Sequence, residues 1–227
     1  YIACQGNHDL GHIAADYRYS MMPDYIYPER NIQFEKTLVS TGTNYEGIHT
    51  MENAAFEFEN ETWGKLLVIA FEFAPRDEAL DWARQLIESD RFKNHTVIIL
   101  THSFLLNNGE RIVNEGYKLT PRNWAQAVWD KLVYPSKNIK LVLCGHTGTP
   151  PQMNDSEKVD YHTTTACRVD PAADGHKVVQ MMFNSQSGDG SWNGNGGDCW
   201  LRILEFKPDG KTIGIRTFSP LFALSRR

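Results

Sequence analysis

The chain has 227 residues, of which 41% are hydrophobic and 22% are charged, as is usual for a globular protein. Its formal net charge of −5 at pH 7 argues against a broad nucleic-acid-binding surface, which needs clustered basic residues. The longest apolar run, residues 66–71, is far shorter than the roughly 20 residues of a membrane-spanning helix, so no membrane span is expected in this segment.

The first predicted element is a buried strand over residues 1–4. Residues 54–58 alternate in a way that predicts a half-buried strand, and residues 65–73 are almost continuously apolar, which predicts a central strand. Because the sequence starts at Tyr1 within an apparent strand, we expect a fragment that lacks the N-terminal strands of its domain. A signal peptide would then lie outside the sequence.

A helix is predicted after Pro75, because two acidic residues there precede apolar residues at helical spacing over residues 79–87. That helix leads into a predicted buried strand over residues 96–100.

A second helix is expected to open at Thr120-Pro121, with Trp124, Val128 and Leu132 on its apolar face. A buried strand over residues 139–144 follows. This alternation of strands and helices predicts parallel pairing, with the helices packed on the faces of the sheet.

Beyond residue 150 the pattern changes to strands over residues 178–183, 200–206 and 212–218, with a turn at Pro208-Asp209-Gly210. We expect them to form a second, mostly antiparallel sheet. The predicted fold class is therefore α/β, a layered α/β/β/α sandwich of two mixed β-sheets. We treat residues 1–227 as the C-terminal portion of a single domain, with the α/β core in 1–150 and second-sheet strands in 151–227.

Three polar motifs end the predicted strands: Gly6-Asn7-His8-Asp9, Thr101-His102-Ser103 and Gly145-His146-Thr147-Gly148. Open α/β sheets gather their chemistry at the C-terminal ends of their strands, so we expect the motifs to converge. An amide oxygen and imidazole nitrogens are suitable ligands for a divalent cation. Although a single strand-end His is more often structural, the three motifs together predict a metal site.

The first motif is the most specific. Gly6 permits a sharp turn, His8 can donate or accept a proton near neutral pH, and Asp9 can hydrogen-bond an imidazole and orient it. The alternative interpretation of this motif is a turn with an Asx hydrogen bond and a solvated His.

In order and spacing, these motifs resemble those of the calcineurin-like metallophosphoesterases: Gly-Asn-His-Asp/Glu, a strand-end His and Gly-His-x-His. The resemblance covers residues 1–150, and residues 72–78 resemble a bacterial, often exported, branch of the family. It implies a metallo-dependent phosphatase-like fold and hydrolysis of phosphomonoesters or phosphodiesters. It also implies two divalent ions (manganese, iron or zinc) with a bridging hydroxide, a small phosphorylated substrate and an extracytoplasmic location.

Residue by residue, the resemblance implies that Asn7, His102 and His146 are ligands of one metal. It implies that His8 is the catalytic residue that protonates the leaving oxygen, with Asp9 behind it.

Two departures from the family pattern weaken the second metal site. Gly148 stands where the last ligand His is expected, and neither Asp-x-His/Gln nor Gly-Asp-x-x-Asp precedes Gly6. Asn184 or Gln186 is a conceivable substitute for the missing His. We expect the absent carboxylates to lie upstream of Tyr1.

Two other functions stay open at this point. The departure at Gly148 favours a catalytically degenerate relative that binds a metal, a glycan or a protein. An unrelated metal-dependent hydrolase, such as an amidase, is the second alternative, because metal–histidine sites recur across chemistries.

Several weaker features have structural explanations that we prefer. Residues 189–194 begin like a calcium loop, but the twelfth position is Trp200 instead of Glu. We expect His95 and His176 to be solvated loop residues, whereas His12 and His49 are weak candidates for the pocket. Four tyrosines are expected in core or loop packing, with a substrate-facing wall as the alternative: Tyr17, Tyr19, Tyr25 and Tyr27.

Overall fold

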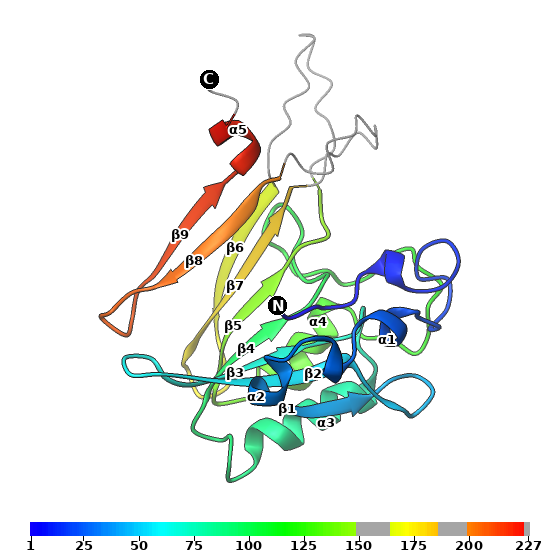
Figure 1. Ribbon diagram of the computed structural model, residues 1–227, viewed down its shortest axis with the longest axis horizontal. Helices are drawn as coiled ribbons and strands as arrows, with labels where there is room; N and C mark the ends of the chain where they lie inside the picture. Colours follow the sequence, from blue (N-terminus) through cyan, green and yellow to red (C-terminus); the bar gives the residue numbers. More distant parts are fainter. Residues whose placement is uncertain (149–163, 186–198, 225–227) are drawn as a thin grey trace.

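The computed structural model describes residues 1–148, 164–185 and 199–224. Its main element is a seven-stranded sheet of order β1-β2-β3-β4-β5-β7-β6 (Figure 1). The strands are β1 Leu38–Thr43, β2 His49–Asn60, β3 Gly64–Ala70, β4 Thr96–Leu100, β5 Ile139–Cys144, β6 Thr164–Pro171 and β7 Lys177–Asn184.

The sheet is mixed. β3, β4, β5 and β7 run parallel, with Leu67 opposite Val97 and Val142 opposite Gln180. β1 and β2 extend it by antiparallel pairing on one side, and β6 does so on the other. The parallel centre directs the C-terminal ends of β4 and β5 to the same edge.

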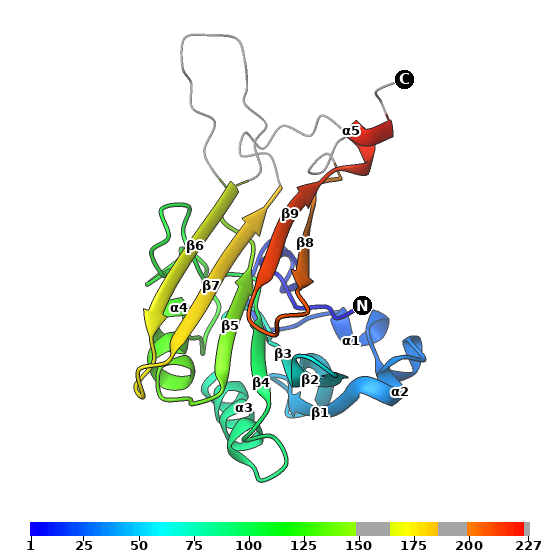
Figure 2. The same ribbon diagram turned by 90° about the vertical axis from the view of Figure 1, so that its left-hand side faces the viewer.

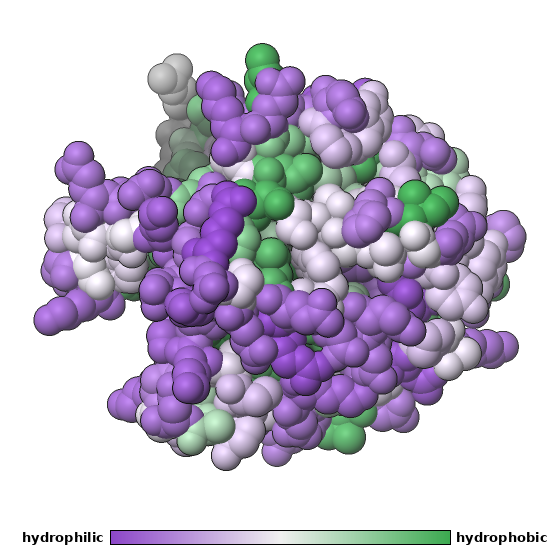
Figure 3. All heavy atoms as spheres, turned by 90° about the horizontal axis from the view of Figure 1, so that it is seen from below, coloured by the Kyte–Doolittle hydropathy of each residue, from purple (hydrophilic) through white to green (hydrophobic). Residues whose placement is uncertain are grey.

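Helices cover one face of this sheet. α3 (Asp77–Glu88) and α4 (Ala125–Val128), which continues as a π-helical turn over Trp129–Val133, pack on inward-facing side chains such as Leu67, Ile69 and Ile99. The exposed side of α3 is polar, and Figure 3 shows this end of the molecule as a mostly hydrophilic surface with small, separate hydrophobic areas. None of the helices in the described residues is long and apolar enough to cross a membrane.

A second sheet covers the opposite face (Figure 2). It consists of β8 (Leu201–Phe206) and β9 (Ile213–Phe218), which pair antiparallel across the predicted turn at residues 208–210. Side chains that alternate with the helix-facing set, including Ile98, Leu141 and Met181, pack against both strands. The predicted layered α/β class is therefore confirmed.

Shorter elements complete the chain and lie mainly in the N-terminal segment. They are the 3-10 turns Asn7–Asp9 and Pro28–Arg30, α1 (Met22–Tyr25), α2 (Phe34–Thr37) and, near the C-terminus, α5 (Pro220–Leu224).

The predicted strand over residues 1–4 is wrong. Tyr1 is 67% exposed, and residues 1–6 form no β-ladder with the described strands. The segment is held by side chains instead: Gln5 accepts a hydrogen bond from the Phe73 N–H and donates one to Glu52.

Three further expectations about the strands are corrected. Residues 54–56 are buried on both faces of the sheet. Ala55 packs in the main hydrophobic core, whereas Ala54 and Phe56 pack with Phe34 in a second cluster. β3 ends at Ala70, since the Glu72 N–H then binds the Asn53 side chain. Residues 178–183 belong to the large sheet, because β7 pairs in parallel with β5.

The second helix begins at Ala125 and not at Thr120. Upstream of it, the backbone N–H and the side chain of Asn123 both donate to the Pro75 carbonyl, and the Leu119 N–H donates to the Ala15 carbonyl. These tertiary hydrogen bonds replace a first helical turn. The predicted apolar face is confirmed, with Trp124, Val128 and Leu132 buried.

Candidate functional site

The three sequence motifs meet in one cavity of about 320 Å³. His102 lies two residues after β4, His146 lies two residues after β5, and Asn7 opens the first 3-10 turn. The cavity is lined by Gly6, Asn7, His8, Asp9, His102, Tyr117 and His146.

The three predicted metal ligands form a continuous chain of contacts. The Asn7 Oδ1 lies 2.9 Å from the His102 Nε2, which lies 3.1 Å from the His146 Nδ1. Metal–ligand bonds of about 2.0–2.2 Å that meet near a right angle separate adjacent donors by about 3 Å. The spacing of these donor atoms therefore fits a divalent cation.

The parallel pairing of β4 and β5 extends beyond the strand ends and fixes the two histidines. The Thr101 N–H donates to the Leu143 carbonyl (3.0 Å), and the Gly145 N–H donates to the His102 carbonyl (2.9 Å). His146 has a φ of +68°, and its carbonyl accepts a hydrogen bond from the Asn184 side chain. A left-handed backbone at a non-glycine residue is uncommon and is concentrated at functional sites.

Gly6 is required by close packing against His102. A Cβ atom at position 6 would stand 3.1 Å from the His102 Cε1 and 3.3 Å from both ring nitrogens. A side chain there would push the imidazole away from Asn7. The glycine of the first motif thus allows Asn7 and His102 to approach each other.

The environment keeps His102 neutral. Burial, followed by the nearby His146, lowers the pKa of His102 to about 4. The ring of the fully buried Phe73 has its centroid 5.8 Å from the ring centroids of both His102 and His146. At neutral pH the His102 ring therefore retains a nitrogen lone pair that can bind a cation.

Two residues that we did not single out in the sequence complete the site. The Glu115 carboxylate lies 2.8 Å from the His146 Nε2 and accepts a hydrogen bond from the Ser103 hydroxyl. The Tyr117 hydroxyl accepts a hydrogen bond from the Asn7 Nδ2, so the amide oxygen of Asn7 faces His102. Both residues lie in the loop after His102, where no periodicity or motif marks them.

The first motif behaves differently from our expectation at Asp9. His8 and Asp9 are exposed at the cavity, but the Asp9 Oδ2 accepts a hydrogen bond from the Gly6 N–H at 2.7 Å. Within the described residues no hydrogen bond joins Asp9 to His8. Asp9 therefore closes the turn that presents His8.

The described residues contain no group of three or more His, Cys, Asp or Glu side chains able to hold a metal ion, so the predicted set depends on Asn7 as its third member. Gly148 offers no donor atom. Asn184 binds the His146 carbonyl through its side-chain nitrogen. The other proposed substitute, Gln186, and the calcium-like loop at 189–194 lie outside the described residues.

The other histidines of the described residues lie away from this cavity or at its rim. His95 is only 4% exposed, with its Nε2 2.8 Å from Glu57, because the chain after α3 folds back against β2. His176 binds Asp174 and the Ile139 carbonyl. The expectation that these two are solvated was therefore wrong. His12 lines an adjoining groove, whereas His49 pairs with the Thr41 backbone on an exposed edge.

Comparisons with known proteins agree with the motifs. A model of the family described as calcineurin-like phosphoesterase matches residues 1–150. The uncharacterized protein YvnB of Bacillus subtilis (strain 168) is 23% identical over 218 residues. The aligned region covers 95% of this chain but 14% of that protein, so the chain spans a small part of this relative.

Proposed function

Because this chain belongs to the calcineurin-like phosphoesterase family, we propose that it is a metal-dependent hydrolase of phosphoesters, with a centre that takes two divalent ions. The observation that carries this proposal is the convergence of one amide oxygen and two imidazole nitrogens, spaced 2.9 and 3.1 Å apart, in a single cavity.

The ligands of one ion would be the Asn7 Oδ1, the His102 Nε2 and the His146 Nδ1. Glu115 supports this assignment for His146, because a carboxylate only accepts hydrogen bonds and therefore places the imidazole proton on Nε2. The Nδ1 lone pair then faces His102. A bound cation supplies Lewis acidity, which polarises a phosphoryl oxygen and lowers the pKa of water.

His8 has the position of a proton donor. It lines the cavity beside Asn7 but is not engaged in the contacts that join Asn7, His102 and His146. An exposed imidazole there can protonate the alkoxide that departs when water displaces it from phosphorus, a role worth typically 10²–10⁴-fold in rate. Asp9 contributes by closing the turn at Gly6.

The proposal is tested by measuring hydrolysis of p-nitrophenyl phosphate, bis-p-nitrophenyl phosphate and a p-nitroanilide amide, with manganese added and after chelation. We expect turnover of at least one phosphoester that chelation abolishes and manganese restores. Turnover of the amide alone would instead identify an unrelated hydrolase.

A second candidate function is that of a binding module that retains the fold without catalysis. The observation that favours it is Gly148, which supplies no donor atom where the family has a ligand His. Stoichiometric metal binding with no hydrolysis of any of the three substrates would support this function and contradict the first.

A further inference from the structure

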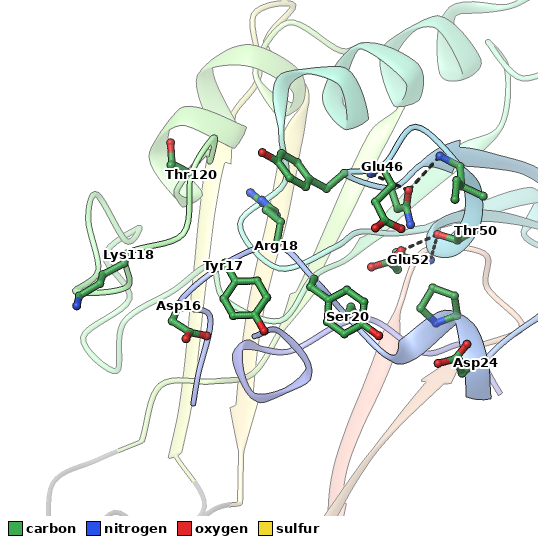
Figure 4. A pocket seen from close by; sticks show the side chains of 15 residues that line it. Asp16, Tyr17, Arg18, Ser20, Asp24, Glu46, Thr50, Glu52, Lys118 and Thr120 are labelled. Carbon is green, nitrogen blue, oxygen red and sulfur yellow. Dashed lines mark hydrogen bonds between the residues drawn. The ribbon is translucent and has the colours of Figure 1, made fainter. Parts of the chain in front are cut away.

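Figure 4 shows a large groove that shares no lining residue with the candidate site and has no role in the proposed hydrolysis. Its volume is about 870 Å³, and its walls come from α1 and the segment before it, from the turn between β1 and β2 with the start of β2, and from the residues around Lys118. A smaller groove of about 510 Å³ links it to the site, because His8 and Asp9 line one part of this groove and Tyr19 lines both grooves. Tyr19 therefore marks the place where the large groove meets the smaller groove in front of His8.

Tyrosine rings form much of the exposed wall. Tyr17, Tyr19 and Tyr45 are 36%, 52% and 55% exposed, and the first two rings stack with their centroids 6.5 Å apart. Aromatic faces that stay accessible beside a catalytic cavity offer a surface to a cationic or planar group. For Tyr17 and Tyr19 this arrangement supports the substrate-facing alternative, whereas Tyr25 lines only the smaller groove and Tyr27 lines neither.

The charge of the groove is predominantly negative. Four carboxylates line it, of which Glu46, Glu52 and Asp24 lie along one side and Lys118 lies across from them (Figure 4). Within the described residues, neither Asp24 nor Glu46 has an ion-pair partner, whereas Glu52 accepts hydrogen bonds from Gln5 and Thr50.

The one buried cation of the wall is not available to a ligand. Arg18 is 5% exposed and donates hydrogen bonds to the carbonyls of Phe73, Ala74 and Pro121. It also lies 3.6 Å from Glu72. Apart from Lys118, the groove therefore presents tyrosine faces and the carboxylates of Asp24 and Glu46 to solvent.

We propose that this groove binds the positively charged amine or quaternary ammonium group of the substrate, so that the chain hydrolyses phosphate esters of amino alcohols. The inference rests on the proposed hydrolytic function. In the reaction, water adds to phosphorus, the ester P–O bond breaks, and the departing amino alcohol takes up one proton. The acidic groove orients the substrate, because the ammonium end is attracted to it and the phosphate end is directed toward the histidines.

Binding is measured first, without turnover. Choline and its neutral isostere 3,3-dimethyl-1-butanol are titrated into the protein by calorimetry. We expect choline to bind at least tenfold more tightly than the isostere. We also expect Tyr19→Leu and Asp24→Asn each to weaken choline binding at least fivefold. Matched controls in the same segment but outside the groove, Tyr27→Leu and Glu29→Gln, should leave it unchanged.

Kinetics then separate this inference from the proposed function. With phosphocholine and p-nitrophenyl phosphate as substrates, Asp24→Asn should raise the KM for phosphocholine at least fivefold relative to the KM for p-nitrophenyl phosphate. If p-nitrophenyl phosphate is hydrolysed but choline and its isostere bind alike, only the groove assignment is overturned. If choline binds as expected but no phosphoester is hydrolysed, the proposed function is overturned, together with the assignment of this groove to a substrate. Binding of a neutral disaccharide in place of choline would identify a carbohydrate site and contradict the proposal.

Discussion

Replacement of Glu115 by leucine should weaken metal binding without removing any proposed ligand. The Glu115 carboxylate contacts the His146 Nε2 at 2.8 Å and the Ser103 hydroxyl at 2.9 Å. Leucine has a similar size but no acceptor, so the imidazole loses the contact that fixes its orientation and its tautomer. Because the side chains of Glu115 and His146 are each only 15% exposed, solvent replaces this contact poorly.

The expected magnitude follows from the position of Glu115 behind a ligand. Loss of such a supporting hydrogen bond typically costs 10–100-fold in metal affinity, or about 1.4–2.8 kcal/mol. Glu115→Gln retains an acceptor oxygen and should recover part of this loss, although the negative charge that attracts the cation is gone. Calorimetric titration of each variant with Mn²⁺ gives the affinities directly.

The matched controls are Glu110→Leu and Glu110→Gln. Glu110 lies on the same loop but is exposed, and its carboxylate accepts a hydrogen bond from the Asn108 side chain and not from a residue of the site cavity. Both control variants should bind Mn²⁺ as the wild type does. If Glu115→Leu also keeps wild-type affinity, Glu115 does not position His146 and the ligand assignment of that histidine loses its support.

Three further predictions concern packing and charge. Gly6→Ala should lower Mn²⁺ affinity, measured by titration, and should lower the free energy of unfolding in urea by roughly 1–3 kcal/mol, because the added Cβ contacts His102. Gly116→Ala is the control, since a Cβ there meets nothing within 4 Å, and it should change neither the affinity nor the stability. Arg18→Met should lower the free energy of unfolding by about 3 kcal/mol, because the buried carbonyls of Phe73 and Ala74 and the carbonyl of Pro121 lose their donor. An unchanged urea midpoint would contradict this. For Asp170, burial raises the pKa of its carboxyl, but hydrogen bonds from two arginines and a glutamine outweigh this and lower the pKa below its usual range. The resulting stabilisation is present above the unfolded-state pKa of about 3.9 and is lost as the pH falls through the folded pKa. The difference in unfolding free energy between wild type and Asp170→Asn should therefore be constant from pH 5 to 7 and shrink only below about pH 4. A decline near pH 6 would show that this stabilisation does not come from the ionised carboxylate of Asp170.

Local signals in the sequence were sufficient for the centre of the fold. The apolar runs before His102 and His146 are β4 and β5, and their parallel pairing brings the two histidines to one edge. The pairing partners of the strands could not be predicted in the same way, because pairing depends on contacts between segments that are distant in the sequence. β7 carries the same alternation whether it joins β5 or the second sheet, so its place in the large sheet was not predictable.

The supporting residues of the site escaped prediction for a related reason. Glu115 and Tyr117 lie in an irregular loop, and only the tertiary fold brings them to His146 and Asn7. Asn7 itself was placed correctly beside His102 although its predicted strand is absent. Side-chain hydrogen bonds of Gln5, and not a β-ladder, hold its segment in position.

We propose that Asn7, His102 and His146 bind a metal while His8 transfers a proton. The most direct test compares the metal content and the phosphoester turnover of His8→Ala and His102→Ala. We predict that His8→Ala retains its metal but loses roughly 10²–10⁴-fold in turnover, and that His102→Ala loses both. Wild-type turnover in His8→Ala would contradict the role of His8 in proton transfer, and full metal content in His102→Ala would contradict the role of His102 as a ligand.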